Sequence, residues 1–408
     1  MVVLCLPMEI VTDIFCRLPV KALLRFRCAS NEFCSLIDHP DFVKLHLKYS
    51  KSHESEYKYL SLIVLRHINN TDMRFFYLLD MDTMKGLVEL KSPLRPNPSI
   101  FPSQVLGSCN GFVCLDSNKG YALTQTPTNG EELVLWNPSI RKHWMLPLPP
   151  KDFQQNPDSK FKFSGYSRGF GYDSIHDDYK LVWVLVWKSQ MNDYVYNCQI
   201  LVYSLKNDIW RKVEFQDRAF APKTYKGVFF GGAIHWFNNI TYERKRKYIV
   251  AFDVVAEEIR FLTLMEEADQ EHSMGLGVLG ECLSATVYND YTRNFDIWVM
   301  KEYGVKSSWT KLVSVSNLSS SLSPIPLAYS RSGMKVLMKN GRELFWCELK
   351  KQVSTKLRNF EEKPKNVYCY DGELCLMNSL ITVNASRASA YKEKEMEQKK
   401  EEDEKLKE

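Results

Sequence analysis

Hydrophobic residues change their spacing once along the chain. Within the first forty residues they recur three and four positions apart in three short runs, Ile10 to Leu18, Ala22 to Phe26 and Phe33 to Ile37, which predicts three short helices. Beyond Tyr59 the apolar residues are mostly β-branched, aromatic or leucine, and they lie in runs of strand length. The pattern predicts a small helical segment followed by a mainly β domain.

Prolines mark the ends of the predicted helices. Pro7 and Pro19 stand at the first turns, where a missing N–H costs nothing, and Pro40 ends the third helix. A further short helix is expected from Val43 to Tyr49. Because about 40 residues cannot bury so many apolar side chains alone, we expect another protein to complete the segment. The alternative is a helical cap packed on the chain's own sheet domain.

A strand pair recurs in the β part. An apolar strand ends in a polar residue, a short polar turn follows, and the chain resumes with Trp or an apolar residue. The copies are Leu133 to Leu146, Ile200 to Val213, Val250 to Leu262, Ile297 to Leu312 and Leu344 to Leu357, with a weaker copy from Tyr77 to Leu90. The last four follow one another at a step of about 48 residues, within the period of kelch-type propeller blades.

A second, glycine-containing hairpin lies between these copies, at Asn110-Gly111, Gly231-Gly232, Gly280 and Asp371-Gly372. Two hairpins per repeat make a four-stranded blade, so we expect a β-propeller of about six blades from Tyr59 to about Val383. The strands from Tyr368 to Met377 have no following hairpin. We expect them to pair with Tyr59 to Leu90 and close the ring, which removes an open sheet edge.

The helical segment resembles the F-box of plant F-box proteins. The similarity rests on Leu6-Pro7-x-Glu9-Ile10, on Ile14-Phe15-x-Arg17-Leu18-Pro19-Val20-Lys21, on Leu23 to Cys28 with Ser30, and on Ser35-Leu36-Ile37. The sequence departs from the family pattern at Ala29, Asn31 and Phe33, where Val, Lys and Trp are usual.

The resemblance implies that the helices bind a Skp-type adaptor, which bridges to a cullin and a RING protein. Leu6-Pro7 and Leu18-Pro19 are the first choices for contact, because the family motif places them there. The full set of candidate adaptor-binding residues is apolar, and the sequence does not divide contact from core within it: Leu6, Pro7, Ile10, Ile14, Leu18, Pro19, Leu23, Phe26, Phe33, Leu36 and Ile37.

The β part resembles the F-box-associated interaction domain of plants. The similarity rests on Asn110-Gly111, Trp136-Asn137-Pro138-Ser139, Phe170-Gly171-Tyr172-Asp173 with Asp178-Tyr179-Lys180, and Trp298 to Gly304 with Ser308-Trp309-Thr310. The stretch Trp298 to Trp309 and the charged tail are more similar to the immune-regulating branch of the family. The two resemblances imply the substrate-recognition subunit of a Skp-cullin-F-box ubiquitin ligase, acting in protein degradation.

The expected fold class is therefore α+β and multidomain. A helical F-box should occupy residues 1–45, a linker 46–58, a propeller-like domain that binds an unknown protein substrate 59–385, and a charged helical or disordered tail 386–408. Substrate should be bound by loops that connect blades on one face. The longest irregular stretches are Lys91 to Gln104, Lys151 to Ser164, Gln216 to Lys226 and Glu266 to Ser273.

Composition narrows the function classes. The chain has 408 residues, of which 45% are hydrophobic and 25% charged, and its net charge of +5 is not gathered into a basic run beside aromatic residues. Nucleic-acid binding is therefore not indicated. The N-terminus lacks a basic leader, and the longest apolar run, Leu181 to Trp187, is too short to span a bilayer. We expect no membrane association and a cytoplasmic or nuclear location.

Neither a metal nor a cofactor is indicated. The eleven cysteines include no C-x-x-C pair, and Cys109 with Cys114, or Cys369 with Cys375, are better interpreted as small core residues. His143, His176 and His235 are isolated and lack metal-ligand spacing. The tryptophans mostly fall at one position of the repeat, where a blade buries a large side chain.

Two enzyme-like motifs lack the structure that their chemistry needs. Gly165-Tyr166-Ser167-Arg168-Gly169 fits a nucleophile elbow, but a turn and a strand follow it, not a helix. Gly275-Leu276-Gly277-Val278-Leu279-Gly280 fits a dinucleotide fingerprint, yet an alternating strand follows. We expect no catalytic residue. The remaining alternatives are a kelch-like interaction scaffold that acts without a ligase, and a propeller enzyme or glycan-binding protein.

Overall fold

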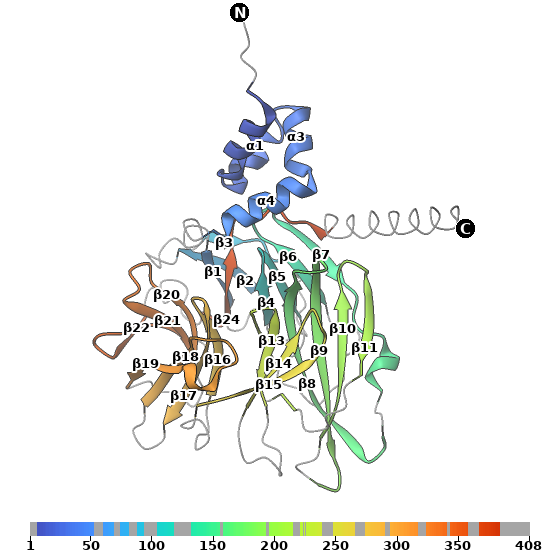
Figure 1. Cartoon of the computed structure of the whole chain (residues 1–408), viewed down its shortest axis with the longest axis vertical. Helices are drawn as coiled ribbons and strands as arrows, with labels where there is room; N and C mark the ends of the chain where they lie inside the picture. Colours follow the sequence, from blue (N-terminus) through green and yellow to red (C-terminus); the bar gives the residue numbers. More distant parts are fainter. Residues whose placement is uncertain are drawn as a thin grey trace, which may run out of the picture.

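In the computed structural model, four helices stand on one end of a ring of antiparallel sheets (Figure 1). The structure describes residues 6–52, 60–68, 74–80, 88–93, 104–117, 132–155, 158–192, 196–214, 221–222, 224, 226–238, 248–265, 274–289, 294–316, 324–340, 343–357 and 367–383. The expected tail from residue 386 lies outside this range.

The four helices are α1 (Met8–Cys16), α2 (Val20–Phe26), α3 (Asn31–Asp38) and α4 (Pro40–Ser50). Pro7 and Pro19 are the N-cap residues of α1 and α2, and α3 ends just before Pro40, as the prolines predicted. The helix expected from Val43 to Tyr49 begins three residues earlier, at Pro40, and ends one residue later, at Ser50. It begins there because Pro40 fits the first turn of a helix and the His39 side chain accepts a hydrogen bond from Asp41 N.

The described strands form six four-stranded sheets, and the first strand given below for each sheet lies at the ring axis, where these six strands contact one another. Their bounds are β24 (Val367–Leu376), β1 (Leu60–Ile68), β2 (Arg74–Asp80), β3 (Val88–Leu90); β4 (Gln104–Cys109), β5 (Phe112–Asp116), β6 (Leu133–Asn137), β7 (Lys142–Leu146); β8 (Phe161–Asp173), β9 (Asp178–Ser189), β10 (Tyr196–Ser204), β11 (Ile209–Val213). The other three sheets are β12 (Val228–Phe230), β13 (Ala233–Phe237), β14 (Tyr248–Asp253), β15 (Ile259–Thr263); β16 (Met274–Leu279), β17 (Cys282–Asn289), β18 (Asn294–Met300), β19 (Trp309–Val315); β20 (Ile325–Tyr329), β21 (Lys335–Asn340), β22 (Glu343–Glu348), β23 (Val353–Lys356). The expected fold class, a helical F-box-like segment before a mainly β propeller, is confirmed.

Strand β24 closes the ring. It pairs antiparallel with β1, from Leu60 opposite Leu376 to Ile68 opposite Val367, so one sheet joins the two ends of the β domain. This is the closure that the unpaired last strands predicted. The pairing covers the edge of β1 that would otherwise be unpaired.

Glycines let neighbouring sheets approach at the ring axis. A Cβ at Gly169 in β8 would lie 2.3 Å from Ile234 Cγ2, and one at Gly275 in β16 would lie 2.4 Å from the Pro324 carbonyl oxygen. Seven of the nine tryptophans are buried, among them Trp183 and Trp236. The repeat position of tryptophan therefore marks the core, as expected.

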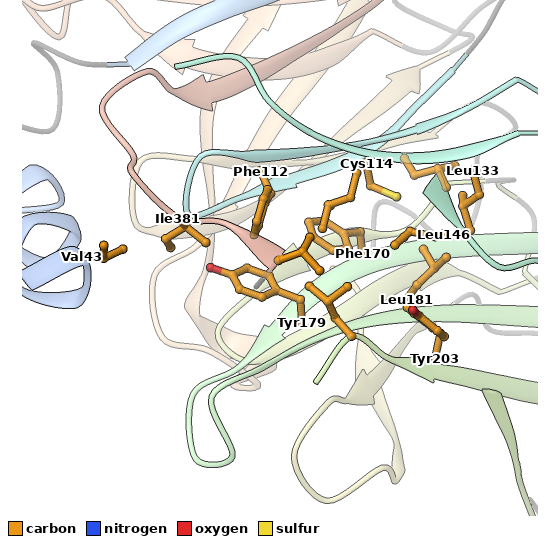
Figure 2. Close-up of a cluster of buried hydrophobic side chains, with 14 of the residues drawn as sticks. Val43, Phe112, Cys114, Leu133, Leu146, Phe170, Tyr179, Leu181, Tyr203 and Ile381 are labelled. Atoms are coloured by element: carbon orange, nitrogen blue, oxygen red, sulfur yellow. The ribbon is translucent and has the colours of Figure 1, made fainter. Parts of the chain in front are cut away.

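The helices share a hydrophobic core with the propeller. Val43 of α4 packs in one cluster with Phe112, Tyr179 and Ile381, and Figure 2 shows these side chains along a continuous path from helix to sheets. Residues Met377–Val383, which we call the strap, continue from β24 to the helices. The sequence left two alternatives for the helices, a cap on the sheet domain and a partner-binding unit. The inner side of the helices packs on the sheet domain as a cap.

Candidate docking surface on the helices

The outer side of the helices carries a group of exposed apolar side chains. Leu6 is 58% exposed, Ile10 49%, Ile14 43% and Phe26 41%. We call these four residues the outer apolar face. Contiguous exposed apolar residues on a small protein commonly mark an interaction site.

Helical periodicity explains why α1 has two apolar sides. Val11 and Phe15 are buried against the other helices, whereas Ile10 and Ile14, one position earlier in each turn, face solvent. Residues four apart lie on one face, so a helix with two adjacent apolar rows buries one and presents the other. Only one row is needed for the fold, which leaves the second available to a partner.

The structure divides the eleven candidate residues by exposure. Six are exposed, three are half-buried, and two are buried: Leu6, Pro7, Ile10, Ile14, Pro19 and Phe26; Leu18, Phe33 and Leu36; Leu23 and Ile37. Leu23 and Ile37 belong to the core that holds the helices together, so they can act on a partner only through their neighbours. The exposed six remain the candidates for direct contact.

An aromatic cluster supports Phe26 from below. The ring centroids of Phe15 and Phe26 lie 5.1 Å apart, and Phe33 meets Phe15 edge-on at 5.1 Å. Phe33, the position where the similar family usually has Trp, is half-buried and packs against Phe15. The other two departures, Ala29 and Asn31, are exposed beside Ser30, whose side chain caps α3 by accepting from Phe33 N.

An ion pair joins the ends of α2 and α3. Arg27 donates to both carboxylate oxygens of Asp38 at 2.7 Å. These hydrogen bonds raise the pKa of Arg27 and, with its charge, lower the pKa of Asp38 despite partial burial. Both side chains are more than 40% exposed, so the pair mainly fixes the angle between the helices and adds little stability.

Polar contacts attach α4 to the propeller. Lys51 Nζ donates to Asn110 Oδ1 at 3.0 Å, and Asn110 Nδ2 in turn donates to the Tyr179 hydroxyl at 3.1 Å. Lys44 forms an ion pair with Asp177 in the turn between β8 and β9. The tight turns β4–β5 and β8–β9 therefore lie on the end of the ring that carries the helices, which we call the helix-side face.

The connections between blades lie at the opposite end, the far face. Because each sheet is antiparallel and β4 and β8 end at the helix-side face, Gln104 and Phe161 begin these strands at the far face. All four predicted substrate loops join one blade to the next and so attach there. Glu266 to Ser273 and most of Lys91 to Gln104 and Gln216 to Lys226 lie outside the described residues.

The far face is described best between β7 and β8. A short 3-10 helix (Lys151–Gln154) places the Phe153 ring under Lys212, whose Nζ is 5.1 Å from the ring centroid. Gln190 binds the same connection through Lys160 O at 3.0 Å and Ser159 O at 3.2 Å. Beside it, Met191 is 89% exposed, a prominent apolar contact point on this face.

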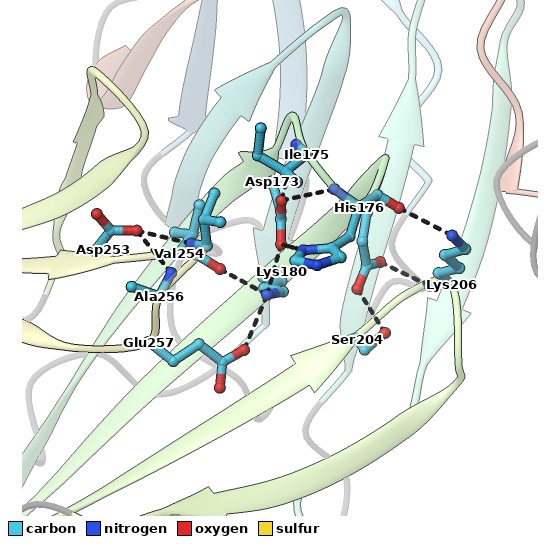
Figure 3. Close-up of polar contacts among 12 residues, drawn as sticks. Asp173, Ile175, His176, Lys180, Ser204, Lys206, Asp253, Val254, Ala256 and Glu257 are labelled. Atoms are coloured by element: carbon cyan, nitrogen blue, oxygen red, sulfur yellow. Dashed lines mark hydrogen bonds and ion pairs between the residues drawn. The ribbon is translucent and has the colours of Figure 1, made fainter.

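A buried polar cluster joins two blades near the helix-side face (Figure 3). Lys180 Nζ contacts Asp173 Oδ2 at 2.8 Å, Glu257 Oε1 at 2.9 Å and the Val254 carbonyl oxygen at 2.6 Å. Burial alone would raise the pKa of Asp173, but hydrogen bonds from Lys180 and His176 bring it below its usual value. The cluster is fully explained as a structural link between blades.

The enzyme-like motifs are structural. Ser167 lies within β8, is buried, and donates through Oγ to the Thr224 carbonyl oxygen at 2.6 Å. The glycine run 275–280 spans β16 and the turn to β17, with no helix after it. Burial raises the pKa of both the Cys109 and Cys114 thiols to about 12, so neither is a ready metal ligand. Across the described residues no group of three metal-ligating side chains occurs.

The isolated histidines have structural surroundings as well. His143 is exposed in β7, and His176 is bound to Asp173 at 2.8 Å. His235 is buried between the Val228 carbonyl oxygen and the Tyr303 hydroxyl. None of the helices that the structure describes is long and apolar enough to cross a membrane.

Comparison with known proteins places both parts of the chain. Residues 3–45 match the F-box domain, and residues 63–382 match the F-box associated beta propeller domain. The chain is 30% identical over 403 residues to F-box protein CPR1 of Arabidopsis thaliana, across 92% of this chain and 88% of the relative. It is also 30% identical over 372 residues to F-box protein At4g22390 of Arabidopsis thaliana, across 86% and 85% of the two chains.

Proposed function

Because the chain belongs to the plant F-box proteins with an F-box-associated β-propeller domain, we propose that it is the substrate-recognition subunit of a Skp-cullin-F-box ubiquitin ligase. The F-box would bind a Skp-type adaptor and through it a cullin. The propeller would hold a target protein for ubiquitination and degradation. Cytoplasm and nucleus, where such complexes act, are the proposed locations.

The outer apolar face carries this proposal. On this face the side chains of Leu6, Ile10, Ile14 and Phe26 are exposed, whereas the opposite side of the helices packs in the core that they share with the propeller. Burying these side chains against a partner would gain about 25 cal/mol for each Å² of apolar surface removed from water. An apolar partner surface is therefore favoured over a charged one at this site.

The far face is the proposed substrate site. The helix-side face is occupied by α4 and the strap, whereas the blade connections gather at the other end of the ring. Binding adaptor and substrate at opposite ends would hold the target within reach of the transfer machinery without blocking it. Raising the local concentration of substrate lysines accelerates transfer by proximity, so no side chain of this chain needs to make or break bonds.

Co-purification with a Skp-type adaptor tests the function. Wild type should capture the adaptor, and Ile14→Glu should lose it, because a charge would be buried in an apolar interface. Ile209→Glu is the matched control, since Ile209 is 56% exposed on β11 of the propeller. If wild type captures no adaptor, the chain is not a ligase subunit of this kind. If Ile14→Glu captures it as well as the control does, the outer apolar face is not the adaptor site.

A role in plant immune regulation is the finer part of the proposal. It rests on the similarity of Trp298 to Trp309 to that branch of the family. Affinity capture under proteasome inhibition should enrich immune receptors with wild type but not with a variant whose 151–160 connection is replaced by a short turn. Recovery of the same proteins with both chains would contradict substrate binding at this part of the far face.

A further inference from the structure

The strap connects the closing strand of the propeller directly to the F-box. Leu380, Ile381 and Val383 are buried in the same cluster as Phe42 and Val43 of α4. The strap begins at the residue after β24, whose pairing with β1 completes the ring. A single short segment therefore takes part in both propeller closure and F-box docking.

Within the strap, Asn378 makes two hydrogen bonds to the F-box. Its Oδ1 accepts from Val20 N at 2.8 Å, and its Nδ2 donates to Ser50 Oγ at 2.8 Å. All three residues are buried, with Asn378 1% exposed. One side chain of the propeller domain thus joins the start of α2 to the end of α4.

The bond to Val20 replaces a helix cap that α2 lacks. The first N–H groups of a helix have no partner within the helix, and a Ser, Thr, Asp or Asn at the N-cap usually accepts from one of them. In α2 the N-cap is Pro19, which has no side-chain acceptor. Asn378 supplies that acceptor from a position 358 residues further along the chain.

The segment held in this way is Leu18-Pro19, a first choice for adaptor contact. On its other side, His46 Nε2 donates to the Leu18 carbonyl oxygen at 3.0 Å. His46 itself is fully buried in α4. The backbone from Leu18 to Val20 is thus fixed from α4 at one end and from the strap at the other.

The propeller in turn fixes the strap. Asn137 Nδ2 donates to the carbonyl oxygens of Ser379 and Ile381, both at 3.0 Å. Gly111, with φ of +88°, lies so close to the strap that a Cβ there would be 2.2 Å from Ser379 Cβ. Blade residues therefore hold the strap that carries Asn378, beside its contacts with the F-box.

We propose that Asn378 is a positioning residue for the adaptor-binding surface, so that the F-box reaches its binding geometry only on a closed propeller. This rests on the proposed ligase function. A chain whose β24 has not entered the ring would carry no strap beneath α2, and its F-box would bind the adaptor weakly. Assembly into the ligase would then be restricted to molecules whose substrate domain is complete.

Hydrogen exchange on the free protein tests the contact itself. Asn378→Ala should reduce protection of the amides from Val20 to Leu23 by about five- to thirtyfold, the effect of losing a helix cap. Asn238→Ala is the matched control, because Asn238 is 4% exposed and its Oδ1 accepts from Ala221 N at 2.8 Å, away from the F-box. Unchanged protection in Asn378→Ala, or an equal loss at Val20 in the control, overturns the proposal.

Adaptor titration tests the consequence. Asn378→Ala should weaken adaptor binding by about five- to thirtyfold, whereas Asn378→Asp should restore most of it, because a carboxylate accepts from both Val20 N and the Ser50 hydroxyl. Ser50→Ala, a milder change, should weaken binding in the same direction. If wild type binds and Asn378→Ala binds equally well, the positioning role is refuted alone. If wild type binds no adaptor, the ligase function is refuted and this role with it.

Discussion

Replacing Lys180 by Met should weaken the joint between two blades more than any exposed ion-pair substitution. Methionine keeps the unbranched stem but removes the ammonium group that contacts Asp173, Glu257 and Val254. The Lys180 side chain is 7% exposed, and those of Asp173 and Glu257 are 0% and 10% exposed. Removing one partner from a buried pair typically costs about 3–5 kcal/mol, because the remaining charge stays buried.

The remaining contacts place this variant at the low end of that range. Asp173 keeps hydrogen bonds from His176 and from the Ile175 amide, and Glu257 keeps Arg211. The Val254 carbonyl oxygen loses a donor, which costs about 1–3 kcal/mol for a buried acceptor. We therefore expect a loss of about 3 kcal/mol in the free energy of unfolding.

Urea unfolding followed by tryptophan fluorescence measures the effect. With an m-value of about 3 kcal/mol/M, the midpoint should fall by about 1 M. The matched control is Lys311→Met, which removes an ion pair to Asp296 at 2.7 Å whose lysine is 45% exposed, and it should shift the midpoint by less than about a third of that. Equal shifts in the two variants would show that burial adds nothing to the Lys180 contacts.

Three further predictions follow from burial and close packing. Burial lowers the pKa of His235 to about 4, so between pH 6.5 and 4 the unfolded chain binds a proton that the folded chain does not. The free energy of unfolding should therefore fall by about 3 kcal/mol as the pH drops through this window. In urea unfolding, His235→Gln should show a weaker dependence of stability on pH. Leu23→Ala should cost about 2–5 kcal/mol of stability, whereas Ile14→Ala should cost less than about 1 kcal/mol and weaken adaptor binding instead; equal stability losses would contradict the division into core and face. Gly169→Ala places a Cβ 2.3 Å from Ile234 and should lower the free energy of unfolding by about 1–3 kcal/mol, measured by urea unfolding. A midpoint equal to that of wild type would refute the close approach of β8 and β13.

Local patterns were sufficient for the elements and the ring. Prolines 7, 19 and 40 located the helix ends, and the repeating hairpins predicted four-stranded blades. The pairing of β24 with β1 was predictable because the last strands had no hairpin of their own. Each of these inferences depends on residues close together in sequence, where spacing carries the information.

Contacts between distant residues were not predictable in the same way. In α1, Ile10, Val11, Ile14 and Phe15 are all apolar, and periodicity alone does not say which row is buried against the other helices. The bond from Asn378 to Val20 joins residues with no shared repeat, and an asparagine after a strand ordinarily indicates a turn. From the sequence alone Lys180 would be expected to be exposed to solvent, because Glu257, with which it forms an ion pair, lies on the next blade.

The two ends of the propeller differ in how easily they can change over evolutionary time. On the helix-side face, the Asn110-Gly111 turn lies against the strap so closely that a single added methyl group would collide with it. On the far face, doubling the length of a connection adds only about 0.6 kcal/mol of closure entropy. The connections of the far face can therefore lengthen and change in sequence at little cost, while the helix-side turn is restricted to glycine at this position.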